Sequence, residues 1–183
     1  MKTGKLADQS LTASLPLFSD ANKNMVTKSV VDARAALAVG YPAFLAHLST
    51  RALNVTGDST LYSVVFDNEV YDLNSNYNPG TGVFTAPVTG KYSLKTTLNL
   101  EGLATTHTMH ILNIVTSNRP FTALDAFTTN PCVAYRYMSL CVDADMDAND
   151  TAYVQLDIRY GSKDVDIYGT STTNSFFSGH LIC

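Results

Sequence analysis

The stretch DNEVYDLNSNYNPGTGVFTAPVTGKY, residues 67–92, decides the fold because it places two tight turns around a short strand. Within Asn78–Gly82 the proline fixes its own φ and the glycines can take positive φ, so a chain reversal is expected before Val83–Ala86. Pro87–Gly90 turns the chain again, and the alternating residues that follow predict a further strand. This spacing is a signature of a fold rather than of an active site.

The run from Asn76 to Tyr92 resembles the core motif of the complement-1q globular head, a trimeric jelly roll related to tumour necrosis factor. Ala43–Ala46 resembles the opening strand of that family, and Met146–Leu156 resembles its turn and penultimate strand. Ser175–Cys183 resembles the closing strand, with His180 where an aromatic residue is usual. These motifs stand in the family's order, so the resemblance extends over most of the chain.

The residue pattern by itself predicts an all-β domain over residues 42–183, because β-branched and aromatic residues alternate between clusters of Gly, Asn, Asp and Pro. In the segment 152–158 the alternate residues are apolar and can face the core together; they are Ala152, Val154, Leu156 and Ile158. Pattern and resemblance together predict a jelly-roll β-sandwich of about ten strands, preceded by an extended arm and one short α-helix.

The first 41 residues differ from the rest. Residues 1–24 are expected to form an extended docking arm, because their few apolar residues cannot build a core alone. The arm residues expected to contact a docking surface are Leu11, Leu15, Leu17 and Phe18. Residues 25–41 are expected to form a short helix and neck, since Ser29 and Asp32 resemble a capping box and Gly40 can end the helix.

The run from Asp20 to Gly40 also resembles segments that precede the distal domains of bacteriophage fibres. That resemblance implies a virion protein, made in the host cytoplasm, whose arm docks on capsid, neck or tail proteins. Its head would decorate the particle or bind a glycan or protein on the host surface. The alternative is a soluble complement-1q-like recognition or signalling module, against which the lack of collagen repeats and of a secretory signal counts.

Val133–Val142 is apolar on both faces, whereas a sandwich strand in a monomer normally has one wet face. The family resemblance implies that identical subunits around a threefold axis cover the second face, in a homotrimer. Tyr135 and Tyr137 suit such a contact, because aromatic side chains are enriched in interfaces, and we assign Tyr153 and His180 to it as well. The alternative is that the tyrosines only cap the sandwich.

Composition excludes some classes of function. The net charge of −4 and the lack of a lysine or arginine cluster argue against nucleic acid as a partner. No apolar window is long enough for membrane insertion. The three cysteines, Cys132, Cys141 and Cys183, have no C-x-x-C spacing, so we expect buried free thiols rather than a disulfide framework or a zinc site.

The acidic run 143–150 suggests calcium, because hard cations need several oxygen ligands close together. It fails the EF-hand pattern, since Ala148 stands at the glycine position and Val154 at the glutamate position. We therefore expect a solvated strand end followed by a turn. A calcium site that uses acids from elsewhere in the chain stays open.

No motif in the sequence supplies catalytic machinery. His107 and His110 are expected to be strand residues on opposite faces, so they cannot share a metal ion. The chain has no nucleophile elbow and no glycine-rich phosphate loop. We predict a non-enzymatic protein without a cofactor, and a β-sandwich carbohydrate-active enzyme is the remaining alternative.

Overall fold

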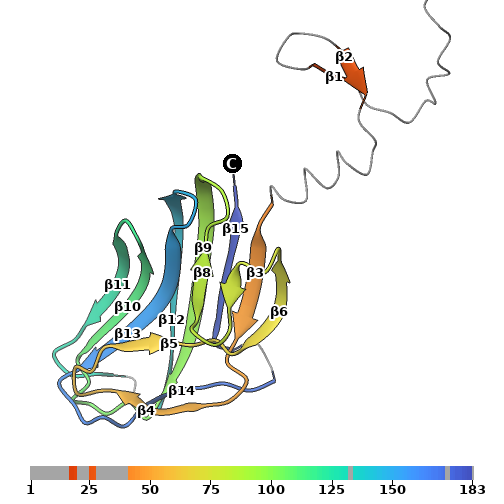
Figure 1. The fold of residues 1–183 in the computed structure, drawn as a ribbon. Coiled ribbons are helices and arrows are strands. Elements are labelled where there is room, and N and C mark those ends of the chain that lie inside the picture. The colour runs from red at the N-terminus through yellow and green to blue at the C-terminus, as the bar shows by residue number, and fades with distance from the viewer. Residues whose placement is uncertain (1–16, 20–24, 28–40, 132–133, 172–173, 183) are drawn as a thin grey trace, which may run out of the picture. The chain divides into compact units, whose positions relative to one another are not determined.

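The computed structural model describes residues 17–19, 25–27, 41–131, 134–171 and 174–182 (Figure 1). Within these ranges the structure has no apolar helix of the length that a bilayer span requires. The chain divides into two units, Met1–Gly40 and Tyr41–Cys183, which we describe separately.

In the first unit, β1 (Leu17–Ser19) pairs antiparallel with β2 (Met25–Thr27). Two of the four predicted arm residues, Leu17 and Phe18, therefore lie on a strand. The other two, Leu11 and Leu15, lie outside the described residues, as does the helix predicted within residues 29–39.

The second unit is a sandwich of two antiparallel sheets (Figure 1). The strands of the six-stranded sheet are β5 (Tyr62–Val64), β7 (Tyr77–Asn78), β8 (Val83–Thr85), β10 (Met109–Thr116), β11 (Pro120–Ala126) and β13 (Thr151–Arg159). The strands of the seven-stranded sheet are β3 (Ala43–His47), β4 (Ala52–Thr56), β6 (Asn68–Leu73), β9 (Gly90–Glu101), β12 (Tyr135–Met146), β14 (Val165–Ile167) and β15 (Phe176–Leu181). The predicted all-β jelly roll is confirmed, with more strands than expected because several very short ones join the edges of the sheets.

Alternation sets the faces of β13 as the sequence predicts. Ala152, Val154, Leu156 and Ile158 are fully buried between the sheets. Tyr153 and Gln155 point away from the core and are half-buried. Residue parity on one strand is therefore enough to divide its side chains between core and surface.

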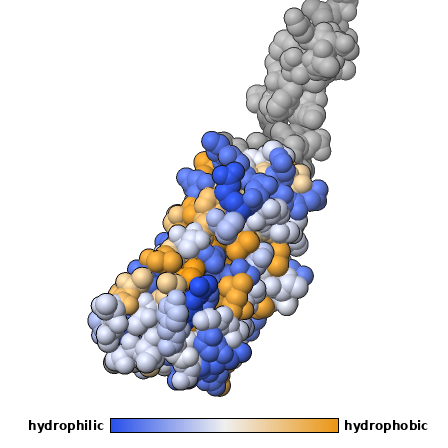
Figure 2. Space-filling view, turned by 90° about the vertical axis from the view of Figure 1, so that its left-hand side faces the viewer, coloured by the Kyte–Doolittle hydropathy of each residue, from blue (hydrophilic) through white to orange (hydrophobic). Residues whose placement is uncertain are grey.

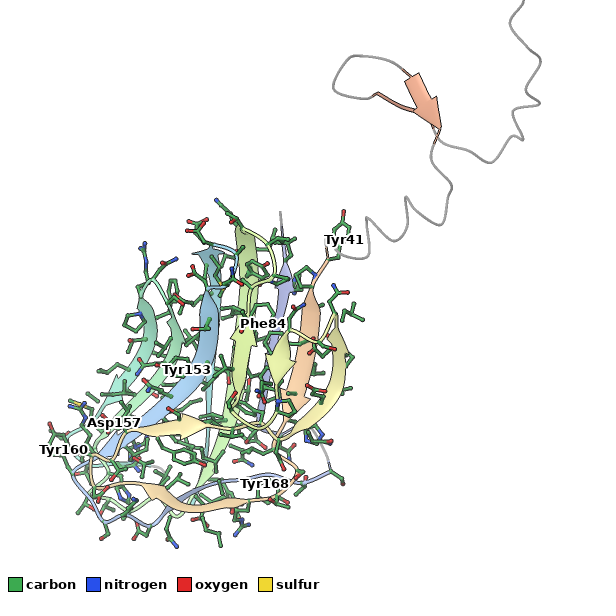
Figure 3. All side chains as sticks on the ribbon, in the orientation of Figure 1. Tyr41, Phe84, Tyr153, Asp157, Tyr160 and Tyr168 are labelled. Carbon is green, nitrogen blue, oxygen red and sulfur yellow. The ribbon has the colours of Figure 1, made fainter. Side chains whose placement is uncertain are left out.

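Aromatic side chains fill one part of the core. Phe44 of β3 stacks on Tyr77 and on Phe84, with ring centroids 5.0 and 4.7 Å apart, and it meets Phe177 of β15 edge-on. Figure 3 shows Phe84 among the strands of the sandwich. A Cβ at Gly179 would lie 2.7 Å from a ring carbon of Phe44, so the chain needs glycine where β15 passes this cluster.

The turn that opens the sequence argument forms as predicted. The carbonyl oxygen of Asn78 accepts hydrogen bonds from the backbone amides of Thr81 and Gly82. Gly82 has a φ of 75°, and a Cβ there would lie 2.5 Å from the carbonyl oxygen of Val64. Glycine is required because the turn combines a left-handed conformation with a close backbone approach.

Replacing Phe44 by alanine should lower the free energy of unfolding by about 3–5 kcal/mol, because the fully buried ring leaves a cavity among three other aromatic side chains. Urea titration followed by circular dichroism measures the change. Leu53→Ala is the control, since that side chain is 62% exposed and its loss should change stability by less than about 0.5 kcal/mol. Equal effects of the two variants would contradict this account of the core.

Candidate functional site

The outer face of the seven-stranded sheet is the candidate site, and β12 forms one border of it. On β12, Met138, Ala144 and Met146 are buried in the core, so the odd-numbered residues of this strand must point outward. Tyr135 and Tyr137 are 62% and 60% exposed. The sequence predicted that both faces of this strand would be covered, and in the single chain only the inner face is.

Register with β9 fixes the neighbours of these outward residues. Tyr137 lies opposite Asn99, and Cys141 lies opposite Lys95. The Asn99 side-chain amide donates a hydrogen bond to the Tyr137 hydroxyl at 3.2 Å. Asn99 itself is only 6% exposed, so the tyrosine covers a polar group of the central strand.

Cys141 corrects one expectation from the sequence. Its thiol is free and exposed rather than buried. The reason is its parity on β12, because Cys141 shares the outward side with Tyr137 while its neighbours Leu140 and Val142 point inward. Cys132 and Cys183 lie outside the described residues.

Both ends of this face carry a pair of opposite charges, but only one of them also carries tyrosines. At one end Arg51 forms an ion pair with the buried Glu101 at 2.5 Å and lies over the ring of Tyr168. At the other end, Lys91 of β9 lies opposite Asp145 of β12. The face therefore runs from a tyrosine-rich end to a charged end.

The phenyl ring of Phe176 lies near the middle of the face. The Lys95 ammonium stands 5.8 Å from the ring centroid, a distance at which a cation is attracted to the aromatic face. Thr97 of β9 lies opposite Phe176 of β15 on one side and opposite Ser139 of β12 on the other. These three residues form a continuous row across the three strands. This row lies between the tyrosine-rich end and the charged end.

A second surface follows the edge where the sandwich is open. Among the strands that the structure describes, β11 pairs with β10 alone and β12 with β9 alone. An ion pair between Arg136 and Asp125 links these two edge strands. Inward-facing apolar residues here stay only half-buried and pack against the core from the side; they are Phe121, Ala123, Leu140 and Val142.

Figure 2 shows the side of the molecule that carries β11, with apolar surface gathered along its middle and hydrophilic surface on either flank. In the middle strands of the sheets the inward residues are fully buried, as Leu98 of β9 and Leu112 of β10 illustrate. We call the half-buried set Phe121, Ala123, Leu140 and Val142 the open edge. These side chains pack against the core but are not fully covered within a single chain.

The predicted interface residues do not all meet. Tyr135, Tyr137 and His180 lie on the outer face of the same sheet, but His180 is opposite Ser93 near the charged end. Tyr153 lies on β13 of the other sheet, and Figure 3 shows it on that strand with Asp157. Three of the four residues therefore share one face, with His180 near the end opposite to the two tyrosines.

The open edge was missed by sequence reasoning. Phe121 and Leu140 look like ordinary core residues in the alternating pattern, and nothing in the pattern says that their strands are unpaired on one side. The available signal was the double-sided apolarity of β12, which pointed to a strand in need of a second partner.

The acidic run ends in a turn, as expected. Asp150 accepts hydrogen bonds through Oδ2 from the Asn118 side chain and from the backbone amide of Asp147, at 3.0 and 2.8 Å. Asp145 precedes this turn as an exposed residue of β12. Among the residues that the structure describes, no group of three or more His, Cys, Asp or Glu side chains could hold one metal ion.

The expectation for the histidines is wrong in part. His110 lies on β10, but His107 lies in the turn before this strand, and both rings are fully buried. His107 accepts a hydrogen bond from the amide of Ala104 and donates one to the carbonyl oxygen of Ser162. A turn allows this inward orientation, which strand alternation would forbid.

Two shallow clefts lie on the surface of the described residues. One, of about 320 Å³, lies near the charged end and is bordered by Lys91, Asn118 and Asp145. The other, of about 480 Å³, lies beside the turn at Asn78. Neither cleft is bordered by Tyr135, by Tyr137 or by the open edge.

Comparisons with known proteins agree with this geometry. The C1q domain family model matches residues 43–182. The globular domain of zebrafish complement 1qA protein aligns with a TM-score of 0.52 at 16% identity and covers 78% of this chain and 96% of its own. Murine APRIL at pH 5.0 aligns with a TM-score of 0.52 at 11% identity, covering 78% and 99%.

These structural likenesses establish the fold, since their identities are low. A comparison with curated protein sequences gives no match. The family model covers nearly all of the jelly-roll unit, from the start of β3 to the residue after β15. The chain belongs to the C1q domain family.

Proposed function

We propose that the jelly-roll unit assembles with two identical copies into a homotrimeric, non-enzymatic binding head. The observation that carries this proposal is the open edge, because half-buried core residues need a partner. Completing the burial of each such side chain would contribute on the order of 1 kcal/mol. The resemblance to the complement-1q head implies the threefold arrangement.

The outer face of the seven-stranded sheet is suited to contact the open edge of a neighbouring copy. It offers Tyr137 and Phe176, whose rings supply large contact area at low entropic cost. Contact between the open edge of one copy and the face of the next would bury different patches on the two sides. Such a contact repeats from copy to copy and can close into a ring.

We place this head on a bacteriophage particle, as a fibre, knob or decoration protein. The support is the resemblance of Asp20–Gly40 to segments of phage fibres together with the apolar residues of the arm, Leu11, Leu15, Leu17 and Phe18. The arm would contact capsid, neck or tail proteins, and the head would face outward toward a host glycan or protein. Three heads would strengthen a weak contact through avidity.

A soluble recognition or signalling module is the second candidate. It is favoured by membership of the C1q domain family and by the likeness to complement 1qA and APRIL. Both candidates need the same trimeric head, so trimerisation is tested first.

Tyr137→Asp should shift the full-length protein from trimer toward monomer, because the substitution puts a charge at the centre of the proposed contact. Analytical ultracentrifugation at micromolar concentration measures the mass. Tyr160→Asn is the matched control: Tyr160 is 63% exposed and its φ of 73° suits asparagine. Figure 3 shows Tyr160 at the end of the sandwich away from Tyr41. A monomeric wild type would refute the trimer.

Cys141 provides a chemical readout of the same surface. In a Cys132→Ser, Cys183→Ser background, its exposed thiol should react with iodoacetamide at least about tenfold more slowly in the assembled protein than in the Tyr137→Asp variant. Mass spectrometry of the alkylated peptide measures the rate. Equal rates at concentrations where the wild type is a trimer would place the contact elsewhere.

The virion proposal is tested by location. Gold-labelled antibody against residues 41–183 should mark purified particles in electron micrographs, and deletion of residues 1–24 should abolish this labelling while the trimer persists. Unlabelled particles from cells that express the full chain would favour the soluble module.

A further inference from the structure

A group of charged and aromatic side chains, buried at His110 but partly exposed at Arg136 and Asp125, joins three strands beneath the tyrosine-rich end. His110 of β10 is fully buried, and its ring meets Phe127 edge-on, with centroids 5.5 Å apart. The Arg136 guanidinium of β12 lies over the ring of Phe127, 4.9 Å from its centroid. Arg136 also pairs with Asp125 of β11.

Hydrogen bonding defines the protonation of His110. Its Nε2 donates to the carbonyl oxygen of His107 at 2.9 Å. In the neutral ring Nδ1 is therefore the unprotonated nitrogen. This Nδ1 is buried without a hydrogen-bond partner among the described residues, and so is Nε of Arg136. Nδ1 is an acceptor in the neutral ring and Nε–H of Arg136 is a donor, so neutral His110 adds no second unpaired donor and no second positive charge to this site.

Protonation would reverse this match. Nδ1 would become a second donor in a site that already has the unpaired Nε–H of Arg136. It would also add a positive charge near Arg136, whose own charge is balanced by a single carboxylate, Asp125. The hydrogen bond from Nε2 to His107 would survive, so the conflict is confined to the side of the ring that carries Nδ1.

We propose that His110 and Arg136 form an acid-sensitive latch that holds the beginning of β12, and with it Tyr135 and Tyr137, in place for self-association. When His110 gains a proton, the conflict is relieved if the beginning of β12 moves outward and the Arg136 side chain, of which 22% is already exposed, brings its buried Nε into water. The two tyrosines flank Arg136 in the chain, so they must move with it. This inference rests on the proposed trimer for its effect on assembly, but the latch itself belongs to the single chain.

The titratable and charged groups that face His110 are few. They are Arg136 from β12, Asp125 from β11 and His107 from the preceding turn. The residue opposite His110 on β13 is Ile158, which does not titrate. Burial has the largest effect on the pKa of His110 and lowers it. The hydrogen bond to His107, next in size, raises the pKa, the charge of Arg136 lowers it again, and the charge of Asp125 raises it, so that the net pKa is lowered.

Because the pKa of His110 is lowered in the folded chain, the stability of the fold decreases in acid. The unfolded chain has an ordinary histidine pKa of about 6.5 and binds the proton first as the pH falls. The stability that neutral His110 supplies is present above about pH 6.5 and is lost as the pH falls from there toward the lower pKa of the folded state. Acid should therefore loosen the beginning of β12.

The test compares wild type with His110→Gln in the full chain. Glutamine can keep a donor toward His107 and does not titrate. Between pH 7.5 and 5.5 the wild type should lose about 2–4 °C more in melting temperature than the variant, and its trimer dissociation constant should rise at least about threefold more. Tyr160→Asn is the control, because Tyr160 is 63% exposed and lies outside both the latch and the proposed contact, so this variant should keep the acid response of the wild type.

A second readout separates the latch from the trimer. The His110 pKa, measured by NMR, should lie below 6.5 in the wild type and rise in Arg136→Met, which removes the neighbouring charge and keeps an apolar chain over Phe127. The protection of the amides of residues 135–138 against hydrogen exchange, relative to their intrinsic rate at each pH, should fall between pH 7.5 and 5.5 in the wild type but not in His110→Gln.

Three outcomes have distinct meanings. A His110 pKa at or above 6.5, or equal acid responses of wild type and His110→Gln, would overturn the latch. A monomer at every pH that still shows the lowered pKa and the acid-induced exchange would refute the trimer and retain the latch. A trimer whose dissociation constant does not follow His110 protonation would overturn the link between them.

Discussion

The register of β12 against β9 ties the core of this molecule to its surface. The two strands pair along all twelve residues of each, from Tyr135 opposite Glu101 to Met146 opposite Gly90. Because side chains alternate, burying Met138 forces Tyr137 outward, and a slip of one residue would exchange the two faces. The exposed tyrosines are therefore a consequence of how the core is filled.

The same strand stands at an edge, which explains why its inner face is only partly covered. A sheet ends where pairing ends, and the last strand has core neighbours on one side only. Leu140 and Val142 face inward but lie beside the opening between β11 and β12. A partner that covered this opening would bury the half-buried core residues and form the contact between the two copies at the same time. A loop or an isolated side chain could not cover so much of the opening.

The fold was predictable because its signals are local. The turn at Asn78–Gly82 and the alternation in 152–158 follow from single-residue conformational limits and from the period of a strand. The open edge and the burial of His107 depend on how distant segments meet, as in the hydrogen bond from His107 to Ser162. The outward orientation of Tyr135 and Tyr137 was predictable because parity can be read from the sequence, whereas Tyr153 has the same parity signal on the other sheet and could not be told apart from them.

β12 also belongs to both surfaces that a neighbour would touch. It contributes Tyr135 and Tyr137 to the outer face and Leu140 and Val142 to the open edge. If one copy presents its edge to the face of the next, each β12 takes part in two contacts of the ring, so moving a single strand weakens both. A proton on His110, which lies behind that strand, would then act on the whole assembly rather than on one contact. This explains how a buried ring without access to solvent could influence a surface that it does not touch.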